Sequence, residues 1–173
     1  MIPQDIREFI KSFSYGFLGT ADLAGKPNIS IKGIVDVDKD RLYFFDLFKA
    51  KTRKNLEKNS RISFFVIDWD NFIGYQLKGR AKIMDKGEVL EKYMNIWENK
   101  RKDLIISRIL DNIKNEKLKK AHYFSLLKPQ YLIIMDVEEI YDLVEPIKVL
   151  VKSKLDRVDV EEYITDTGSG MEG

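Results

Sequence analysis

Two short segments of this sequence, residues 42–45 and 62–67, are apolar on both alternating faces of an extended strand. A strand of a half-solvated sheet alternates apolar and polar residues, because only one of its faces is buried. In these two segments one face can fill the interior of a sandwich or barrel, and the other face then needs a second cover. A helix or a second copy of the chain would provide that cover, which gives a first argument for a dimer.

Turn residues separate these segments from further segments with strand character. Connections of this length and composition favour antiparallel hairpins in a sandwich or barrel. The expected strands are Tyr15–Asp22, Asn28–Val37, Arg41–Asp46, Arg61–Asp68, Ile73–Met84, and a sixth that begins at Gln130–Met135 and runs on toward Tyr141. The sequence therefore predicts a mainly β fold with peripheral helices.

Apolar residues at helical spacing predict three helices, and a fourth, Thr52–Lys58, is expected between the third and fourth strands. The expected helices are 3–13, Thr52–Lys58, Glu88–Asn99 and Asp103–Lys119. The last two make a helical insertion, about residues 86–128, before the last strand. We expect one domain over residues 1–145 and a C-terminal extension over 146–173. The end of that extension, residues 165–173, is polar and rich in glycine, which predicts disorder.

Composition excludes several classes of protein. Charged residues make up 34% of the 173 residues, yet the formal net charge is only +2, which argues against a general nucleic-acid binder. The chain has no cysteine, which excludes disulfide scaffolds, thiolate zinc sites, iron–sulfur clusters and cysteine nucleophiles. Its single histidine, His122, cannot form a histidine-rich metal site, and we predict no metal.

The sequence also bears on location. Charged residues interrupt the first twelve positions, so we expect no signal peptide there. No apolar run approaches the roughly 20 residues that a membrane span needs, so we expect no membrane association. The absence of cysteine fits a reducing compartment, and we expect a cytoplasmic protein.

The segment 45–56 combines the end of a strand, a short loop and the start of a helix. Lys51, Thr52 and Arg53 stand where the helix begins, and the unpaired N–H groups of a helix start carry a partial positive charge. A phosphate group suits such a place. The segment also fits a solvated surface helix with Thr52 as its N-cap, and taken alone it favours this second interpretation.

Polar residues occupy alternate positions of the expected second strand. Asn28, Ser30 and Lys32 share one face, and the isoleucines at positions 29, 31 and 34 are left to pack elsewhere. A flat polar heterocycle needs such an edge, with donors for its carbonyl groups. An ordinary half-exposed strand shows the same alternation. In the fifth strand Gln76 lies on the polar face, where a plain solvent-facing residue would also stand.

Four motifs in register resemble the FMN-binding split-barrel family, also called the pyridoxamine-5′-phosphate-oxidase-like family. The resemblance covers residues 5–84 well and the sixth strand more weakly. The motifs are Phe17-Leu18-Gly19-Thr20-Ala21 with Gly25-Lys26-Pro27-Asn28-Ile29-Ser30, then Arg41-Leu42-Tyr43-Phe44-Phe45, then Lys51-Thr52-Arg53-Lys54-Asn55-Leu56 before Asn59-Ser60-Arg61-Ile62-Ser63, then Leu77-Lys78-Gly79-Arg80-Ala81. No single motif is specific, but their order is.

The resemblance implies a six-stranded antiparallel split β-barrel and a homodimer with two FMN sites at the subunit interface. It also assigns residues to the cofactor. The residues that the resemblance places at FMN are Asn28, Ile29, Ser30 and Lys32 beside the isoalloxazine ring, Lys51 and Thr52 at the phosphate with Leu47 in the adjoining loop, and Gln76 reaching the ring, often across the dimer. It identifies no catalytic residue.

The resemblance leaves the reaction open. The arginine-and-histidine substrate motif of pyridoxamine phosphate oxidase is not found, since the only histidine precedes the sixth strand, so we do not expect that oxidase activity. One interpretation is a flavin oxidoreductase whose electron donor is a nicotinamide or a deazaflavin. A second is a flavin-binding or electron-transfer protein without turnover. A third is a module without flavin, in which the cations at 49–54 meet nucleic acid or another phosphate ligand.

Overall fold

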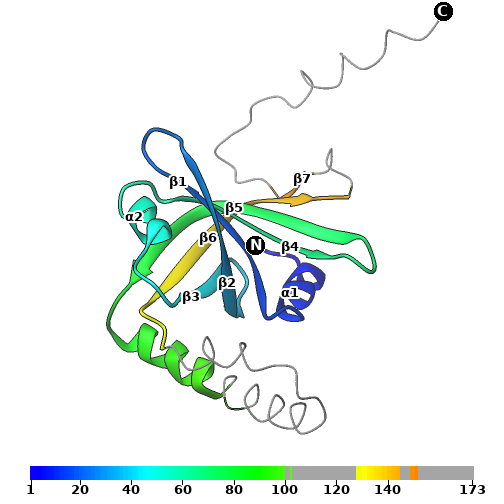
Figure 1. Cartoon of the computed structure of the whole chain (residues 1–173). Helices are drawn as coiled ribbons and strands as arrows, with labels where there is room; N and C mark the ends of the chain where they lie inside the picture. Colours follow the sequence, from blue (N-terminus) through cyan, green and yellow to red (C-terminus); the bar gives the residue numbers. More distant parts are fainter. Residues whose placement is uncertain (100–101, 103–127, 145–148, 152–173) are drawn as a thin grey trace, which may run out of the picture.

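A computed structural model of the chain describes residues 1–99, 102, 128–144 and 149–151. The strands in this part of the chain form one antiparallel sheet in the order β3-β2-β1-β4-β5-β6-β7. An additional pairing of β3 with β6 closes the first six strands into a barrel (Figure 1). The predicted mainly β fold with a six-stranded antiparallel barrel is therefore confirmed.

The strands begin and end close to the expected residues. They are β1 (Tyr15–Ala21), β2 (Pro27–Val37), β3 (Arg41–Asp46), β4 (Arg61–Asp68), β5 (Ile73–Met84), β6 (Tyr131–Asp142) and β7 (Val149–Val151). The bounds of β3, β4 and β5 are those predicted, and β6 runs on to Asp142. The short strand β7, which pairs with the end of β6, was not expected.

The helices are shorter than the sequence predicts. α1 spans Gln4–Lys11, and α2 spans Lys51–Leu56, so α2 begins one residue earlier and ends two residues earlier than expected. Residues 88–99 are helical, as predicted. The predicted helix at 103–119 and the predicted disorder at 165–173 lie outside the described residues, as does His122.

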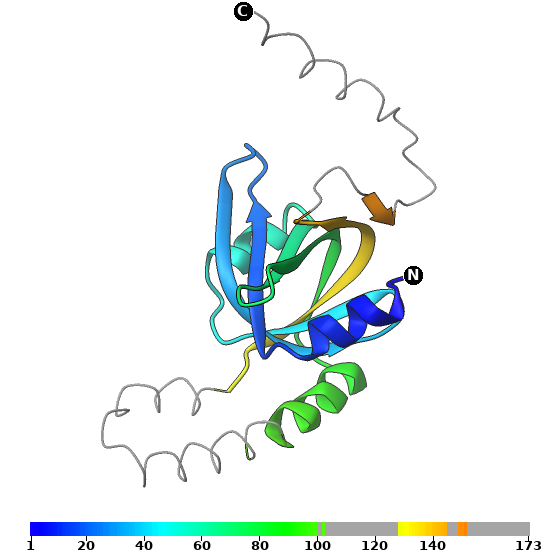
Figure 2. The same cartoon turned by 90° about the vertical axis from the view of Figure 1, so that its right-hand side faces the viewer.

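The barrel interior is filled by one cluster of apolar side chains. Phe44 of β3 and Phe64 of β4 are fully buried in it, with ring centroids 4.8 Å apart. α1 adds Ile6 and Ile10, and α2 adds Leu56, so both helices contribute to this core. Figure 2 shows α1 packed against the barrel, below β7 in this view. Burial of these side chains is the main favourable term in folding.

A helix provides the second cover that β3 requires. Tyr43 and Phe45 point to the outer side of β3, where they pack against the helical segment 88–99. The rings of Tyr43 and Tyr93 stack at 4.3 Å, and Trp97 meets Phe45 edge to face at 6.4 Å. The apolar residues Leu90, Tyr93, Met94 and Trp97 of this segment face β3, whereas Val89 is 42% exposed.

This cover corrects the argument for a dimer from the apolar strands. Of the four phenylalanines in the two apolar segments 42–45 and 62–67, Phe44, Phe45 and Phe64 are buried within a single chain. Only Phe65 is partly exposed, and it stacks on Phe17 of β1 at 4.7 Å. The case for a partner subunit therefore depends on the outer side of β1, β2 and β4.

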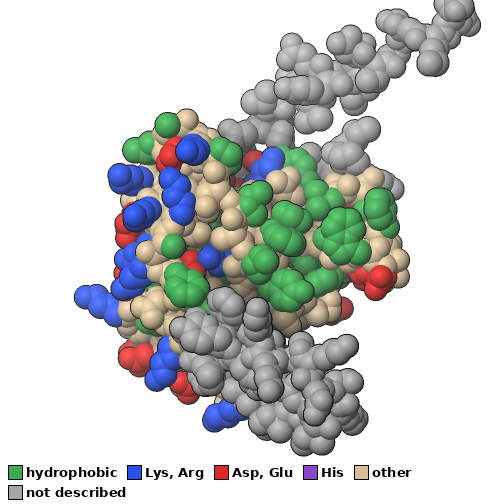
Figure 3. Space-filling model, viewed as in Figure 1, with side chains coloured by type: hydrophobic (Ala, Val, Ile, Leu, Met, Phe, Trp, Pro, Cys, Tyr) green, Lys and Arg blue, Asp and Glu red, His purple; other side chains and the backbone are tan. Residues whose placement is uncertain are grey.

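That outer side carries a continuous apolar surface. We call it the apolar outer face, and it consists of Tyr15, Phe17, Ile29, Ile31 and Phe65. Phe17 lies opposite Ile31 on β2 and opposite Phe65 on β4, which places the three side chains in one row. Ile29 and Ile31 are 68% and 61% exposed. Figure 3 shows apolar side chains gathered on this side of the barrel and basic ones along the edge near α2.

Candidate functional site

The alternation of β2 separates its polar and apolar side chains. Asn28, Ser30 and Lys32 turn toward α2 and the end of β3, and Lys32 is buried. Ile29 and Ile31 turn outward. The expectation that residue 34 packs with these two isoleucines is wrong, because an even-numbered residue shares the face of Ser30 and residue 34 lies in the barrel core.

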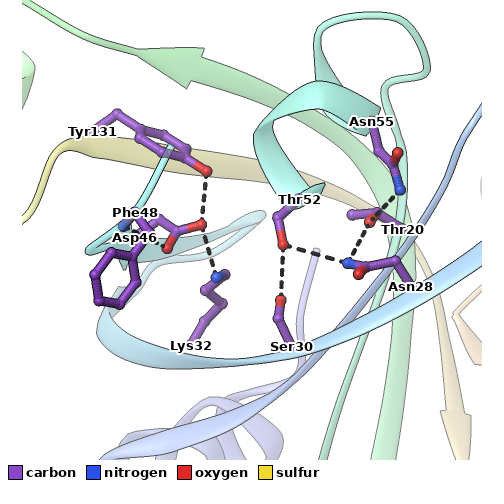
Figure 4. Close-up of polar contacts among 9 residues, drawn as sticks. All are labelled: Thr20, Asn28, Ser30, Lys32, Asp46, Phe48, Thr52, Asn55 and Tyr131. Atoms are coloured by element: carbon purple, nitrogen blue, oxygen red, sulfur yellow. Dashed lines mark hydrogen bonds and ion pairs between the residues drawn. The ribbon is translucent and has the colours of Figure 1, made fainter. Parts of the chain in front are cut away.

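A layer of polar side chains fills the space between β2, β1 and α2 (Figure 4). The hydroxyl oxygens of Ser30 and Thr52 are 3.0 Å apart, and the Asn28 amide donates to Thr52 at 3.5 Å and to Thr20 at 3.3 Å. The buried Asn55 amide also donates to the Thr20 hydroxyl, at 3.1 Å. These contacts bring the predicted residues Asn28, Ser30 and Thr52 together and fix α2 on the barrel.

Thr52 does not have the capping role that a surface helix would give it. The N-cap of α2 is Ala50, and no side chain caps this helix. Thr52 is the second helical residue, is only 4% exposed, and directs its hydroxyl toward β2. The interpretation of Thr52 as an N-cap is therefore wrong.

Lys32 belongs to a buried ionic cluster at the end of β3. Its ammonium lies 2.7 Å from Asp46 Oδ2, and both side chains are less than a tenth exposed. The hydroxyl of Tyr131 donates to the same carboxylate oxygen at 2.7 Å, and the backbone N–H of Phe48 donates to the other at 3.2 Å. Burial, together with this carboxylate, raises the pKa of Tyr131, so the hydroxyl keeps its proton at neutral pH.

The three donors expected at the start of α2 are not equivalent. Lys51 is half-exposed, and its ammonium lies 3.7 Å from an oxygen of Asp22. Arg53, by contrast, makes a bidentate ion pair with Asp85 at 2.5 and 2.8 Å and a third contact with Glu57. Its guanidinium also lies 5.0 Å from the ring centre of Tyr131. The expectation that Arg53 adds a donor beside Lys51 is therefore not met.

Leu47 lies next to the ionic cluster, whereas Gln76, on β5, lies away from β2. Leu47 begins the loop 47–50 that joins β3 to α2, next to the ionic cluster. Gln76 pairs across from Phe65, and its amide donates to Ser63 at 2.8 Å on the outer side of the sheet. Three strand spacings of about 4.8 Å separate Gln76 from β2, so within one chain it lies far from Asn28.

Sequence reasoning missed four residues of the site. Asp46 and Tyr131 complete the ionic cluster, and Thr20 and Asn55 complete the polar layer. One signal was available for Asp46, since it follows four apolar residues at the end of β3 and a buried carboxylate there needs a cation. Tyr131 follows the insertion, and its pairing with β3 was not fixed by local sequence.

The described residues offer no metal site, no unpaired buried polar group and no membrane-spanning helix. Among them no group of three or more His, Cys, Asp or Glu side chains could hold a metal ion. Every buried side-chain nitrogen or oxygen in this part of the chain has a hydrogen-bond partner. Of the helices that are described, none is long and apolar enough to span a bilayer.

Comparison with known proteins agrees with this architecture. The family model described as pyridoxamine 5′-phosphate oxidase matches residues 2–140. No curated protein matches the chain. Among solved structures, HupZ of Group A Streptococcus is similar with a TM-score of 0.64 and 23% identity, over 84% of this chain and 97% of that one.

Two further solved structures share the fold at lower identity. An FMN-binding protein from Syntrophomonas wolfei subsp. wolfei has a TM-score of 0.59 and 15% identity, covering 79% of this chain and 82% of its own. A protein named F420 reductase has a TM-score of 0.52 and 17% identity, covering 80% of this chain and 98% of its own. At these identities the likeness concerns the fold.

The ionic cluster predicts a large cost for removing Asp46. Asp46→Ala leaves the Lys32 ammonium buried without its counter-ion, and we expect the free energy of unfolding to fall by about 3–5 kcal/mol. Urea denaturation measures this change. The matched control is Asp136→Ala, which breaks exposed ion pairs with Arg41 and Lys82 and should cost clearly less. Equal losses in the two variants would contradict the assignment of a buried, interdependent pair.

Proposed function

The chain belongs to the pyridoxamine 5′-phosphate oxidase family, and from this premise we propose that it is a homodimeric flavoprotein that binds FMN between its subunits. We propose further that the bound FMN serves an oxidoreductase reaction with a nicotinamide or a deazaflavin as electron donor. The phosphate binds at Lys51, beside the loop 47–50. The isoalloxazine ring lies along residues 28–32 of β2.

One observation carries this proposal: the two segments assigned to the phosphate and to the ring lie side by side. Ser30 of β2 and Thr52 of α2 are 22 residues apart in sequence, and their hydroxyl oxygens are 3.0 Å apart (Figure 4). A single elongated ligand with a phosphate at one end and a flat ring at the other can therefore contact both segments.

The start of α2 fits an anionic phosphate. The Lys51 ammonium is half-exposed and makes only a long, 3.7 Å contact with Asp22. Asp22 already accepts the backbone N–H groups of Ala24 and Lys26 in the turn between β1 and β2. An exposed ion pair of this length contributes little, so an incoming phosphate can replace Asp22 as the partner of Lys51.

The outer edge of β2 fits the flat ring. Ile29 and Ile31 present apolar side chains there, and a π-system buries well against such a surface. Covering the ring from the other side requires a second body, because both isoleucines are exposed in one chain. A second copy that docks on the apolar outer face would provide this cover, and it would also bring its own Gln76 toward the ring.

The protein needs few catalytic groups for this chemistry. FMN, when bound, supplies the hydride or electron transfer, so the chain's task is to bind and orient it and to exclude water. Lys51 holds the phosphate, and β2 holds the ring. The ammonium of Lys32 is balanced by Asp46, so Lys32 contributes no unpaired positive charge beside the ring.

The balanced ionic cluster also favours a second candidate, a flavin-binding or electron-transfer protein without turnover. Lys32, Asp46 and Tyr131 satisfy one another, which leaves none of the three poised as an acid or base. Stopped-flow mixing of the FMN-loaded protein with NADH, NADPH or a reduced deazaflavin separates the two candidates. Rapid bleaching of the flavin by any donor supports an oxidoreductase, and slow bleaching by all three supports a carrier.

The phosphate assignment predicts a selective effect of Lys51→Ala. A charge-assisted contact contributes about 1.5–3 kcal/mol, so we expect FMN affinity to fall by about tenfold to hundredfold. Riboflavin lacks the phosphate and should bind the variant and the wild type equally. Titration of both ligands by fluorescence quenching measures this.

The control for Lys51→Ala is Lys58→Ala. It removes one exposed positive charge just beyond the other end of α2, and it should leave the affinity for both ligands unchanged. A parallel loss of FMN and riboflavin affinity in Lys51→Ala would mean that Lys51 does not bind the phosphate.

The dimer assignment predicts that a charge on the apolar outer face dissociates the subunits. We expect the wild type to sediment at twice the chain mass of 20.3 kDa, and Ile31→Lys to shift toward the monomer because it would bury an unpaired charge. Val89→Lys is the matched control, since Val89 is an exposed aliphatic residue in the helical segment 88–99. A wild type that sediments as a monomer would remove the interfacial flavin site.

A further inference from the structure

We infer that Tyr131 is a positioning residue for the FMN phosphate, acting through Asp46 on the loop 47–50 without touching the ligand. The inference rests on the proposed function, because it concerns how the site for the phosphate is held. The proposed flavin chemistry gives no role to the buried cluster of Tyr131, Asp46 and Lys32. The inference assigns this cluster a structural role.

The two oxygens of the Asp46 carboxylate have different tasks. Oδ2 takes both side-chain partners, Lys32 and Tyr131, each at 2.7 Å. Oδ1 accepts the backbone N–H of Phe48 at 3.2 Å. Because two partners from β2 and β6 hold Oδ2, the carboxylate cannot rotate freely, and Oδ1 stays directed at the loop.

A short series of backbone hydrogen bonds extends this control to α2. Phe48 donates to Asp46, Ala50 donates to the carbonyl of Phe48 at 3.0 Å, and Lys54 donates to the carbonyl of Ala50 at 3.1 Å. Each of these bonds restrains the backbone position of its donor residue, and the next bond starts from that residue. The orientation of one carboxylate therefore sets the path of the chain as far as the turn of α2 that contains Lys51.

Tyr131 supports the same segment a second time through its ring. The Arg53 guanidinium lies 5.0 Å from the ring centre, and Asp85 and Glu57 hold the guanidinium there. The neighbouring residue Gln130 donates its N–H to the carbonyl of Asp46 at 2.8 Å. Gln130 and the first residue of β6, Tyr131, are thus tied to both ends of the loop that joins β3 to α2.

The experiment removes a single hydroxyl. Tyr131→Phe keeps the buried ring and its contact with Arg53, and it deletes only the hydrogen bond to Asp46. Loss of one such bond changes an equilibrium by about threefold to tenfold. We expect FMN affinity to fall by that factor, riboflavin affinity to stay within about twofold, and amide exchange across residues 47–50 of the ligand-free protein to rise.

The structure offers a closely matched control in Tyr43→Phe. Tyr43 is also a buried tyrosine, and its hydroxyl also donates to an aspartate, Asp38, at 2.7 Å. Asp38 lies in the turn between β2 and β3, at the opposite end of β3 from Asp46. Tyr43→Phe should therefore lower stability by a similar amount and leave FMN affinity and exchange at 47–50 unchanged.

The outcomes separate this inference from the proposed function. A wild type that binds neither flavin overturns the proposed function, and exchange at 47–50 then still decides whether Tyr131 holds the loop. A wild type that binds FMN together with an unchanged FMN affinity in Tyr131→Phe overturns the inference alone. Equal losses for FMN and riboflavin, or equal losses in Tyr131→Phe and Tyr43→Phe, overturn it as well, because they indicate a general loss of stability.

Discussion

The pairing of β3 with both β2 and β6 is the constraint on which the rest of the structure depends. It closes the barrel, and it makes β3 a central strand that is covered on both faces. Because β3 pairs on both sides, the side chain at its end meets residues from β2 and from β6. At one of those ends stands Asp46, between Lys32 of β2 and Tyr131 of β6, and the loop toward α2 begins there.

Closure also explains why the candidate site has two unlike sides. The inward side chains of β2 meet α2 and form a satisfied polar layer, whereas the outward side chains, Ile29 and Ile31, lie exposed. A ligand at this strand therefore meets fixed polar groups near α2 and apolar surface along the outer face. That division matches a molecule with a phosphate at one end and a flat ring at the other.

The sequence predicts the barrel well because its strands are apolar segments that turn residues bound. The bounds of β3, β4 and β5 agree to the residue, since apolar segments and turns mark them locally. The site is harder, because its contacts are long-range. Asn28, Ser30 and Thr52 were assigned to one place and do meet, but the partners of Lys32 and Arg53 come from β3, from β6 and from Asp85, which no local pattern links to them.

The assignment of a phosphate to Lys51 follows from which cations near α2 already have close ion-pair partners. Arg53 and Lys32 are each held in ion pairs at 2.5–2.7 Å, so of these three cations Lys51 is the one that a ligand can reach most easily. A site that depends on one exposed lysine binds its anion through few contacts. We therefore expect an affinity for FMN that is sensitive to salt, since exposed charges are screened.

The most direct test of the central claim is the flavin content of the freshly purified protein, completed by titration of the cofactor-free protein with FMN. The account predicts the visible absorption of a bound flavin, and saturation at a molar amount of FMN equal to that of the chains. A colourless protein that leaves FMN fluorescence unchanged throughout the titration would contradict the account.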